Sequence, residues 1–140
     1  MSDSLTLSLA NRTVEVERMT AAVDQFARAH GMAADDLHNI HLMLDELVIN
    51  IIRHGYDDDR AHIIDLRLSI EASVLTIALE DDGLAFDPTK APLPKFHLPI
   101  EERPIGGLGV HIVKTLCDTM TYRRVGDRNV LTVTKTVHRA

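Results

Sequence analysis

The strongest constraint on the fold is a pair of alternating segments in the middle of the chain. The runs HIIDLRLSI and SVLTIALED each place apolar side chains at every second position, and only Glu71 and Ala72 separate them. Such alternation is typical of half-buried strands, and a connection this short joins strands that run antiparallel. We therefore predict a β-hairpin leading into Asp81, within a largely antiparallel sheet.

Two other stretches predict further strands. LTLSLA places Leu5, Leu7 and Leu9 on one side of an opening strand. Near the other end, TYRRVGDRNVLTVTKTV predicts a second hairpin that turns at Gly126 to Asn129.

Two helices are predicted between the opening strand and the first hairpin. The first runs from Thr13 to His30 and stops at Gly31. The second runs from about Asp36 to His54, where we expect Asp35 or Asp36 to accept a hydrogen bond from the first turn. Gly55 is expected to end this helix in a left-handed conformation.

A long irregular loop and a third helix follow the hairpin. Gly83 to Gly106 holds all five prolines, which argues against regular structure, and loops of this length in compact domains are often functional. The stretch GGLGVHIVKTLCDTM then opens on glycines and continues at helical spacing, with apolar positions Val110, Val113, Cys117 and Met120.

This order of elements predicts an α/β two-layer sandwich. Strands joined mainly by short turns favour a mostly antiparallel mixed sheet, and helices with one apolar side each would cover one face of it. With 140 residues, 45% of them hydrophobic, the chain is expected to form a single domain over residues 1–140.

Charge and composition exclude several classes of protein. The formal net charge of −6 argues against the broad basic surface that nucleic-acid binding requires. Cys117 is the single cysteine, so no internal disulfide can form. No signal peptide or run long enough to span a bilayer is present, so we expect a cytoplasmic protein with no membrane partner.

The predicted second helix carries a polar stripe beside its apolar side. Glu46, Asn50 and His54 are spaced four residues apart, which places them on one side of the helix. Glu46 could accept a proton from a hydroxyl, and Asn50 could offer an oxygen to Mg²⁺. Alone, the same spacing is also that of an ordinary polar helix border.

Two other stretches carry possible binding chemistry. In EDDGLAFDP, an aspartate at a strand end could accept a hydrogen bond from an exocyclic amine, although Asp and Gly are also common in turns. In RPIGGLGVHIVK, backbone N–H groups at a helix start favour phosphate, although a glycine-rich helix start is common as well.

Together, in this order, the three stretches resemble the N, G1 and G2 boxes of the GHKL (Bergerat-fold) ATPase and kinase superfamily. Within it, the chain looks like the anti-sigma-factor serine-protein kinases of the RsbW/SpoIIAB type. The resemblance extends from Leu5 to Thr136. It implies the Bergerat ATP-binding fold, with ATP and Mg²⁺ bound to it.

The resemblance also implies roles for individual residues. Glu46 would be the general base, Asn50 the Mg²⁺ ligand and His54 a helper near the phosphates. Asp81 would bind the adenine amino group, with Gly83 beside the ring and Thr132 assisting through water. The remaining residues would contact phosphates: the amides of Gly107, Leu108 and Gly109, and Arg103 at the end of an ATP lid formed by residues 84–105.

The sequence departs from the family pattern at one position of the adenine site. Where the G1 box often reads D-x-G-x-G, this chain has Ala85, which has less backbone freedom than glycine. The chain also shows no histidine-bearing hairpin before the domain, so we do not expect a complete histidine kinase.

The function implied by the resemblance is an ATP- and Mg²⁺-dependent serine/threonine protein kinase acting as an anti-sigma factor. Its partners would be an anti-anti-sigma (STAS) protein, which it phosphorylates, and a sigma factor, and it could form a homodimer. Two alternatives stay open: a nucleotide-regulated partner-switching module with little catalysis, and a stand-alone histidine-kinase-like ATPase domain acting on a separate phosphoacceptor.

Overall fold

The computed structural model describes residues 3–91 and 107–140 of the chain. In chain order, the elements in these residues are β1 (Ser4–Ala10), α1 (Glu15–Ala29), α2 (Ala34–His54), β2 (Ile63–Glu71), β3 (Val74–Asp81), a short 3-10 helix (Pro88–Lys90), α3 (Gly107–Leu116), β4 (Thr119–Val125) and β5 (Arg128–Thr136). Among the helices of these two ranges, none combines the length and the apolar character that crossing a membrane requires.

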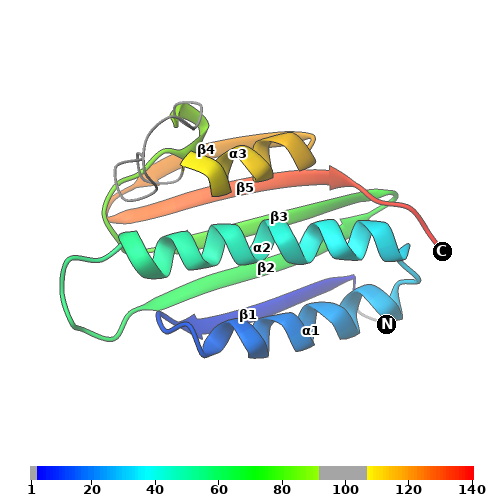
Figure 1. Cartoon of the computed structure of the whole chain (residues 1–140), viewed down its shortest axis with the longest axis horizontal. Coiled ribbons are helices and arrows are strands. Elements are labelled where there is room, and N and C mark those ends of the chain that lie inside the picture. Colours follow the sequence, from blue (N-terminus) through cyan, green and yellow to red (C-terminus); the bar gives the residue numbers. More distant parts are fainter. Residues whose placement is uncertain (1–2, 92–106) are drawn as a thin grey trace.

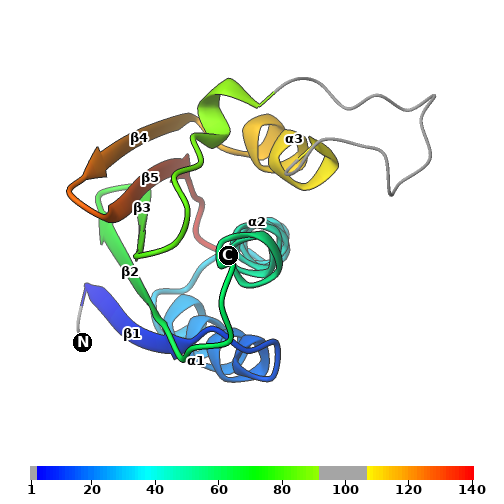
Figure 2. The ribbon, with the colours of Figure 1, turned by 90° about the vertical axis from the view of Figure 1, so that its left-hand side faces the viewer.

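The strands form one sheet with all three α-helices on the same side. The strand order is β1-β2-β3-β5-β4, and each neighbouring pair is antiparallel. Figure 1 shows α2 crossing the middle of the sheet, with α1 beside β1 and α3 near β4 and β5. The end view in Figure 2 separates the layer of strands from the layer of helices. The α/β two-layer sandwich predicted from the sequence is confirmed, although the described strands include no parallel pair.

The core lies between these two layers. Alternate residues of β2 and β3 are almost completely buried, as the period of two in the sequence predicts. They pack against the inward side of α2, which contributes Ile40, Met43, Leu44, Leu47 and Val48. Burial of these side chains fixes the rotation of α2 about its axis, and therefore the direction of its polar stripe.

Both ends of α2 differ from expectation. Its first turn has no side-chain cap, since the residue before it is Ala33. Asp36 is instead buried and accepts hydrogen bonds from the backbone N–H of His138 (2.6 Å) and from His138 Nδ1 (3.0 Å). Gly55 has a right-handed φ of −79°, so the expected left-handed ending is wrong. A different requirement, described with the site below, explains a glycine there.

The third helix is shorter than its apolar spacing predicts. It ends at Leu116, and Met120 lies in β4, because backbone pairing with β5 begins at once: Asp118 N–H donates to Thr134 O (2.8 Å). Cys117, half-buried at this junction, behaves as a small apolar residue, and burial raises the pKa of its thiol.

The last hairpin turns more tightly than expected. Val125 pairs with Arg128, which leaves Gly126 and Asp127 as the connection, and Gly126 has a φ of +60°. Asn129, expected in the turn, therefore belongs to β5.

Candidate functional site

A pocket opens between α2, the start of α3 and the end of the sheet where β3 finishes. Its walls are largely apolar and come from α2, α3, β4, β5 and residues 84–88. Five residues with polar groups also line it: Asn50, His54, Asp81, Tyr122 and Asn129. An apolar slot with a few convergent polar groups is the usual form of a small-molecule site.

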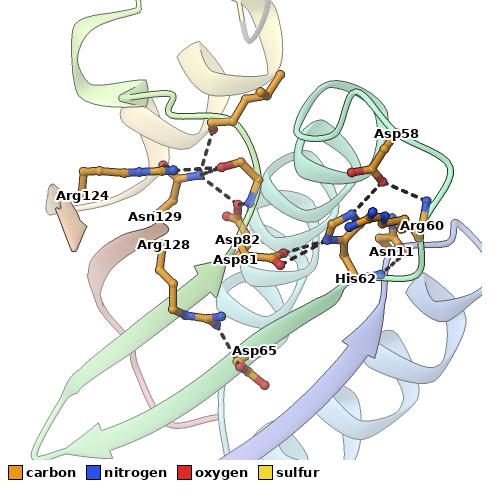
Figure 3. A network of polar contacts seen from close by, with 12 residues as sticks. Asn11, Asp58, Arg60, His62, Asp65, Asp81, Asp82, Arg124, Arg128 and Asn129 are labelled. Carbon is orange, nitrogen blue, oxygen red and sulfur yellow. Dashed lines mark hydrogen bonds and ion pairs between the residues drawn. The ribbon is translucent and has the colours of Figure 1, made fainter. Parts of the chain in front are cut away.

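Asp81 is a nearly buried acid in this pocket, with 4% of its surface exposed. One of its oxygens, Oδ1, accepts hydrogen bonds from the backbone N–H of Gly83 (2.9 Å) and from Asn129 Nδ2 (2.9 Å). Figure 3 shows Asn129 reaching Asp81 from the neighbouring strand. These two bonds hold the carboxylate in one orientation.

The polar stripe of α2 divides between the pocket and a helix contact. Asn50 and His54 line the pocket, as does Leu47 from the adjoining apolar side of the helix. Glu46 lies one turn earlier and contacts α3: a Cβ built on Gly109 would come within 2.5 Å of Glu46 Oε2. The acid predicted as a base therefore lies beside the first turn of α3.

Gly83 is required by a close contact between two backbones, whereas Gly55 is required by a close contact within its own helix. Leu84 N–H donates to the carbonyl of Gly55 (2.6 Å). A Cβ on Gly83 would lie 2.5 Å from that carbonyl oxygen and 2.9 Å from Asp81 Oδ1. A Cβ on Gly55 would likewise lie 2.5 Å from the carbonyl of Ile51. Glycine allows the end of α2 to meet the segment after β3 directly.

The segment that leaves the pocket begins with an anchored 3-10 helix. Asp87 caps it by accepting from the backbone N–H of Thr89 (2.9 Å), and Pro88 is buried in the pocket wall. Lys114 of α3 donates to the carbonyls of Thr89 (3.1 Å) and Ala91 (3.2 Å). α3 thus supports this wall of the pocket.

Part of the expected phosphate site and most of the expected lid lie outside the residues that the structure describes. Residues 92–105 of the expected lid at 84–105, Arg103 among them, lie outside the described residues. Gly107, Leu108 and Gly109 form the first turn of α3, where backbone N–H groups have no partner within the helix. Gly109 lies beside Glu46, and the phosphate contacts expected of the three amides stay a prediction.

Thr132 is not part of the pocket. Side chains alternate along β5, and Asn129 and Leu131 face the pocket, so Thr132 lies on the opposite face of the sheet. Thr132 therefore does not line the pocket, and the role expected of it stays a prediction. Asn129 was not identified as a site residue from the sequence. Asn129, Leu131 and Val133 are the buried, inward-facing residues of β5, and the amide at the first of these positions is the signal that could have identified it.

A second polar cluster lies beside Asp81. His62 is placed between Asp58 (Nε2 to Oδ1, 2.8 Å) and Asp82 (Nδ1 to Oδ1, 3.0 Å), as Figure 3 shows. The hydrogen bond with Asp58, and then that with Asp82, raises the pKa of His62. Its ring stacks on Tyr56, with centroids 4.2 Å apart, and burial raises the pKa of the Tyr56 phenol.

The residues present fit a magnesium ion held mainly by a ligand. Within the two described ranges, no three His, Cys, Asp or Glu side chains are grouped to hold a metal. Asn50 offers one amide oxygen at the pocket. Mg²⁺ usually retains waters and takes one or two protein oxygens together with substrate phosphates, so a single amide is sufficient for that mode and too little for a protein-only site.

Comparison with known proteins gives a family for this architecture. The model of the histidine kinase-like ATPase domain matches residues 9–135. Among curated proteins, the serine-protein kinases RsbW of Bacillus cereus (strain B4264) and Bacillus anthracis (strain CDC 684 / NRRL 3495) are each 29% identical over 109 residues. The match covers 75% of this chain and 66% of each relative, slightly less than two thirds of their length.

Solved structures agree on the fold. The crystal structure of the RsbU and RsbW domains of a Mycobacterium tuberculosis protein superposes with a TM-score of 0.68 at 16% identity, covering 99% of this chain and 34% of that one. A blue-light activated histidine kinase of Erythrobacter litoralis gives a TM-score of 0.55 at 18% identity, covering 89% of this chain and 41% of that one. At these identities the likeness concerns the fold alone.

Proposed function

The chain belongs to the histidine kinase-like ATPase domain family, and from that premise we propose that it is an ATP- and Mg²⁺-dependent serine/threonine protein kinase. The observation that carries the proposal is the arrangement around the pocket. Asp81 is a buried acid in an apolar slot, Asn50 and His54 are at its edge, and Glu46 lies against the first turn of α3.

In this proposal Asp81 accepts a hydrogen bond from the exocyclic amine of adenine, and the apolar walls enclose the ring. Gly83 has no side chain that would press on Asp81 Oδ1. The phosphates extend along α2 toward the amides of residues 107–109, where the helix start favours negative charge. Asn50 would hold Mg²⁺, which would offset charge on the phosphates.

Glu46 acts as the general base. Its carboxylate takes the proton of a serine hydroxyl on a partner protein as that oxygen attacks the γ-phosphorus. The bond between the γ-phosphorus and the β,γ-bridging oxygen breaks, ADP leaves with that bonding pair, and phosphoserine remains. The backbone N–H groups at the start of α3 stabilise charge on the transferring group.

The partners we propose follow from similarity to the RsbW kinases. The phosphorylated protein is an anti-anti-sigma protein of the STAS fold, and the protein held inactive is a sigma factor. Such partners place the protein in the cytoplasm. The proposed homodimer would bring two such sites into one assembly.

A transfer assay tests this function. Radiolabelled ATP is mixed with the wild-type protein and a STAS protein encoded near it, with and without a magnesium chelator, and label on the STAS protein is followed. Acid-stable label that requires Mg²⁺ and is lost in Glu46→Gln supports the proposal. Asp81→Asn should lose nucleotide binding, whereas Glu46→Gln should keep it.

The same assay discriminates the alternatives. Tight ATP binding with no transfer by the wild type would favour a nucleotide-regulated switch. Acid-labile label would instead indicate phosphohistidine and a histidine-kinase-like activity.

A further inference from the structure

Asn129 is a buried amide that uses both ends of its side chain; 6% of its surface is exposed. Its Nδ2 donates to Asp81 Oδ1 (2.9 Å) and to the carbonyl of Leu84 (2.9 Å). Its Oδ1 accepts from the hydroxyl of Tyr122 (2.5 Å) and from Arg124 Nη1 (3.1 Å). One amide therefore connects β5 with β3, β4 and the pocket wall.

These partners fix which way the amide points. Arginine can only donate, so the atom facing Arg124 must be the oxygen. Reversing the amide would direct its NH₂ group at that guanidinium and its oxygen at the carboxylate of Asp81. Neither contact could then be a hydrogen bond. β4 thus holds an N–H donor in place against Asp81.

The consequence for Asp81 concerns which oxygen a ligand can use. Oδ1 already receives two donors, from Gly83 and Asn129. The other oxygen, Oδ2, is left for a ligand in the pocket that Asp81 lines. A carboxylate oxygen accepts a hydrogen bond from an amine and repels a carbonyl oxygen placed at the same point.

We propose that Asn129 is a positioning residue that, by holding Asp81, makes the pocket select a 6-aminopurine over a 6-oxopurine. This inference rests on the proposed nucleotide site and concerns its selectivity. Asn129 acts through Asp81 and needs no contact with the base. Without the donor from Asn129, the carboxylate of Asp81 can turn, and its preference for the amino group is lost.

Asn129→Asp tests the donor with almost no change of shape. The variant keeps the oxygen that accepts from Tyr122 and Arg124. It replaces the group that donates to Asp81 and to the carbonyl of Leu84 with a second carboxylate oxygen. Calorimetry with Mg²⁺ at neutral pH gives the dissociation constants of ADP and IDP. We expect the wild type to prefer ADP, and Asn129→Asp to reduce that preference about 10-fold, since a hydrogen bond to a charged group is lost.

The pH dependence separates positioning from general damage. Two adjacent carboxyl groups share a proton more readily as the pH falls, so the variant should recover ADP preference under acidic conditions. His54 also lines the pocket, so the wild type is titrated in parallel. Val130→Ala, on the same strand but the opposite face, is the matched control and should keep the wild-type preference.

The outcomes distinguish a failure of the proposed function from a failure of the role proposed for Asn129. Wild type that binds neither nucleotide overturns the proposed function itself. If wild type binds ADP but Asn129→Asp keeps its preference, or loses ADP and IDP equally, only the role of Asn129 is overturned. Should Asn129→Asp fail to fold, Tyr122→Phe removes one donor that orients the amide. A preference reduced about 3-fold supports the role, and an unchanged one overturns it.

Discussion

The carboxylate of Glu46 lies against Gly109 so closely that a Cβ at residue 109 would come within 2.5 Å of Glu46 Oε2. The contact joins the middle of α2 to the first turn of α3. Because residue 109 has no side chain, the acid can occupy the space beside the backbone N–H groups that begin α3. The position of the proposed base is therefore set by a glycine on another helix.

Gly109→Ala should impair transfer while leaving the protein folded. The new methyl group displaces the flexible end of Glu46, and alanine favours a helix over glycine by about 1 kcal/mol, which offsets the cost of that movement. We expect a nearly unchanged melting temperature and a transfer rate reduced about 10-fold, against the 10²–10⁴-fold typical of losing a general base.

A double-mutant cycle tests the cause of that loss. In a Glu46→Ala background the methyl group has no carboxylate to displace, so Gly109→Ala should not reduce the residual rate further. An additional loss there would show that residue 109 acts independently of Glu46.

Lys114→Met should loosen the pocket wall formed by the 3-10 helix. Lys114 Nζ donates to the carbonyls of Thr89 and Ala91, and both bonds are lost in the variant. Hydrogen–deuterium exchange should become faster in residues 86–91, and nucleotide affinity should fall by roughly 1 kcal/mol. Thr115→Ala changes the next residue of α3, whose hydroxyl bonds only within the helix, and should leave that exchange as it is. If residues 86–91 exchange at the same rate in Lys114→Met as in the wild type, the anchoring role of Lys114 is contradicted.

Asp36→Ala should destabilise the fold without affecting the pocket. Buried Asp36 accepts from the backbone N–H and Nδ1 of His138, and the variant leaves these donors without their acceptor. We expect a loss of about 1–3 kcal/mol in urea unfolding and unchanged ADP affinity. Asp35→Ala removes the same charge from the same turn at an exposed position, and it should cost much less. Similar losses in both would indicate an effect of charge near the helix start rather than of the buried contact.

His62 should make stability depend on pH. Its pKa is raised in the folded protein by Asp58 and then Asp82, so the stabilisation is complete below the unfolded value, about 6.5, and is lost as the pH rises through the higher folded value. Urea midpoints of the wild type should therefore fall with increasing pH above about 6.5 more steeply than those of His62→Gln. His38→Gln, at an exposed position on α2, should follow the wild type. Parallel curves for wild type and His62→Gln would contradict the ion pairs.

Local patterns were sufficient to predict much of the fold. The hairpin that ends at Asp81 needs only alternation and a short connection, and the stripe of α2 needs only the helical period. Burial of the apolar side of α2 then directs Asn50 and His54 toward the end of β3, where Asp81 lies. These relationships depend on neighbours in sequence or on one packed side of one helix.

The errors occur where distant segments decide. Met120 continues the helical spacing of Val113 and Cys117, but pairing with β5 places it in a strand. The carbonyl of Gly55 accepts a hydrogen bond from Leu84, which is distant in sequence. Asn129 reaches Asp81 because β5 pairs with β3. A single sequence does not specify such pairings, so the contact between Asn129 and Asp81 could not be predicted without the structure.

The bond from Leu84 to the carbonyl of Gly55 has a practical consequence for engineering this protein. This bond joins main-chain atoms only, so it does not depend on the side chains of the exposed acidic loop that follows at residues 57–60. Residues 57–60 are also not among the residues that line the pocket. A fluorophore or a short peptide tag introduced at Asp59 should leave the pocket intact, since exposed loop tips tolerate insertion. Asp59 is therefore a suitable attachment point for a label that must not disturb the pocket.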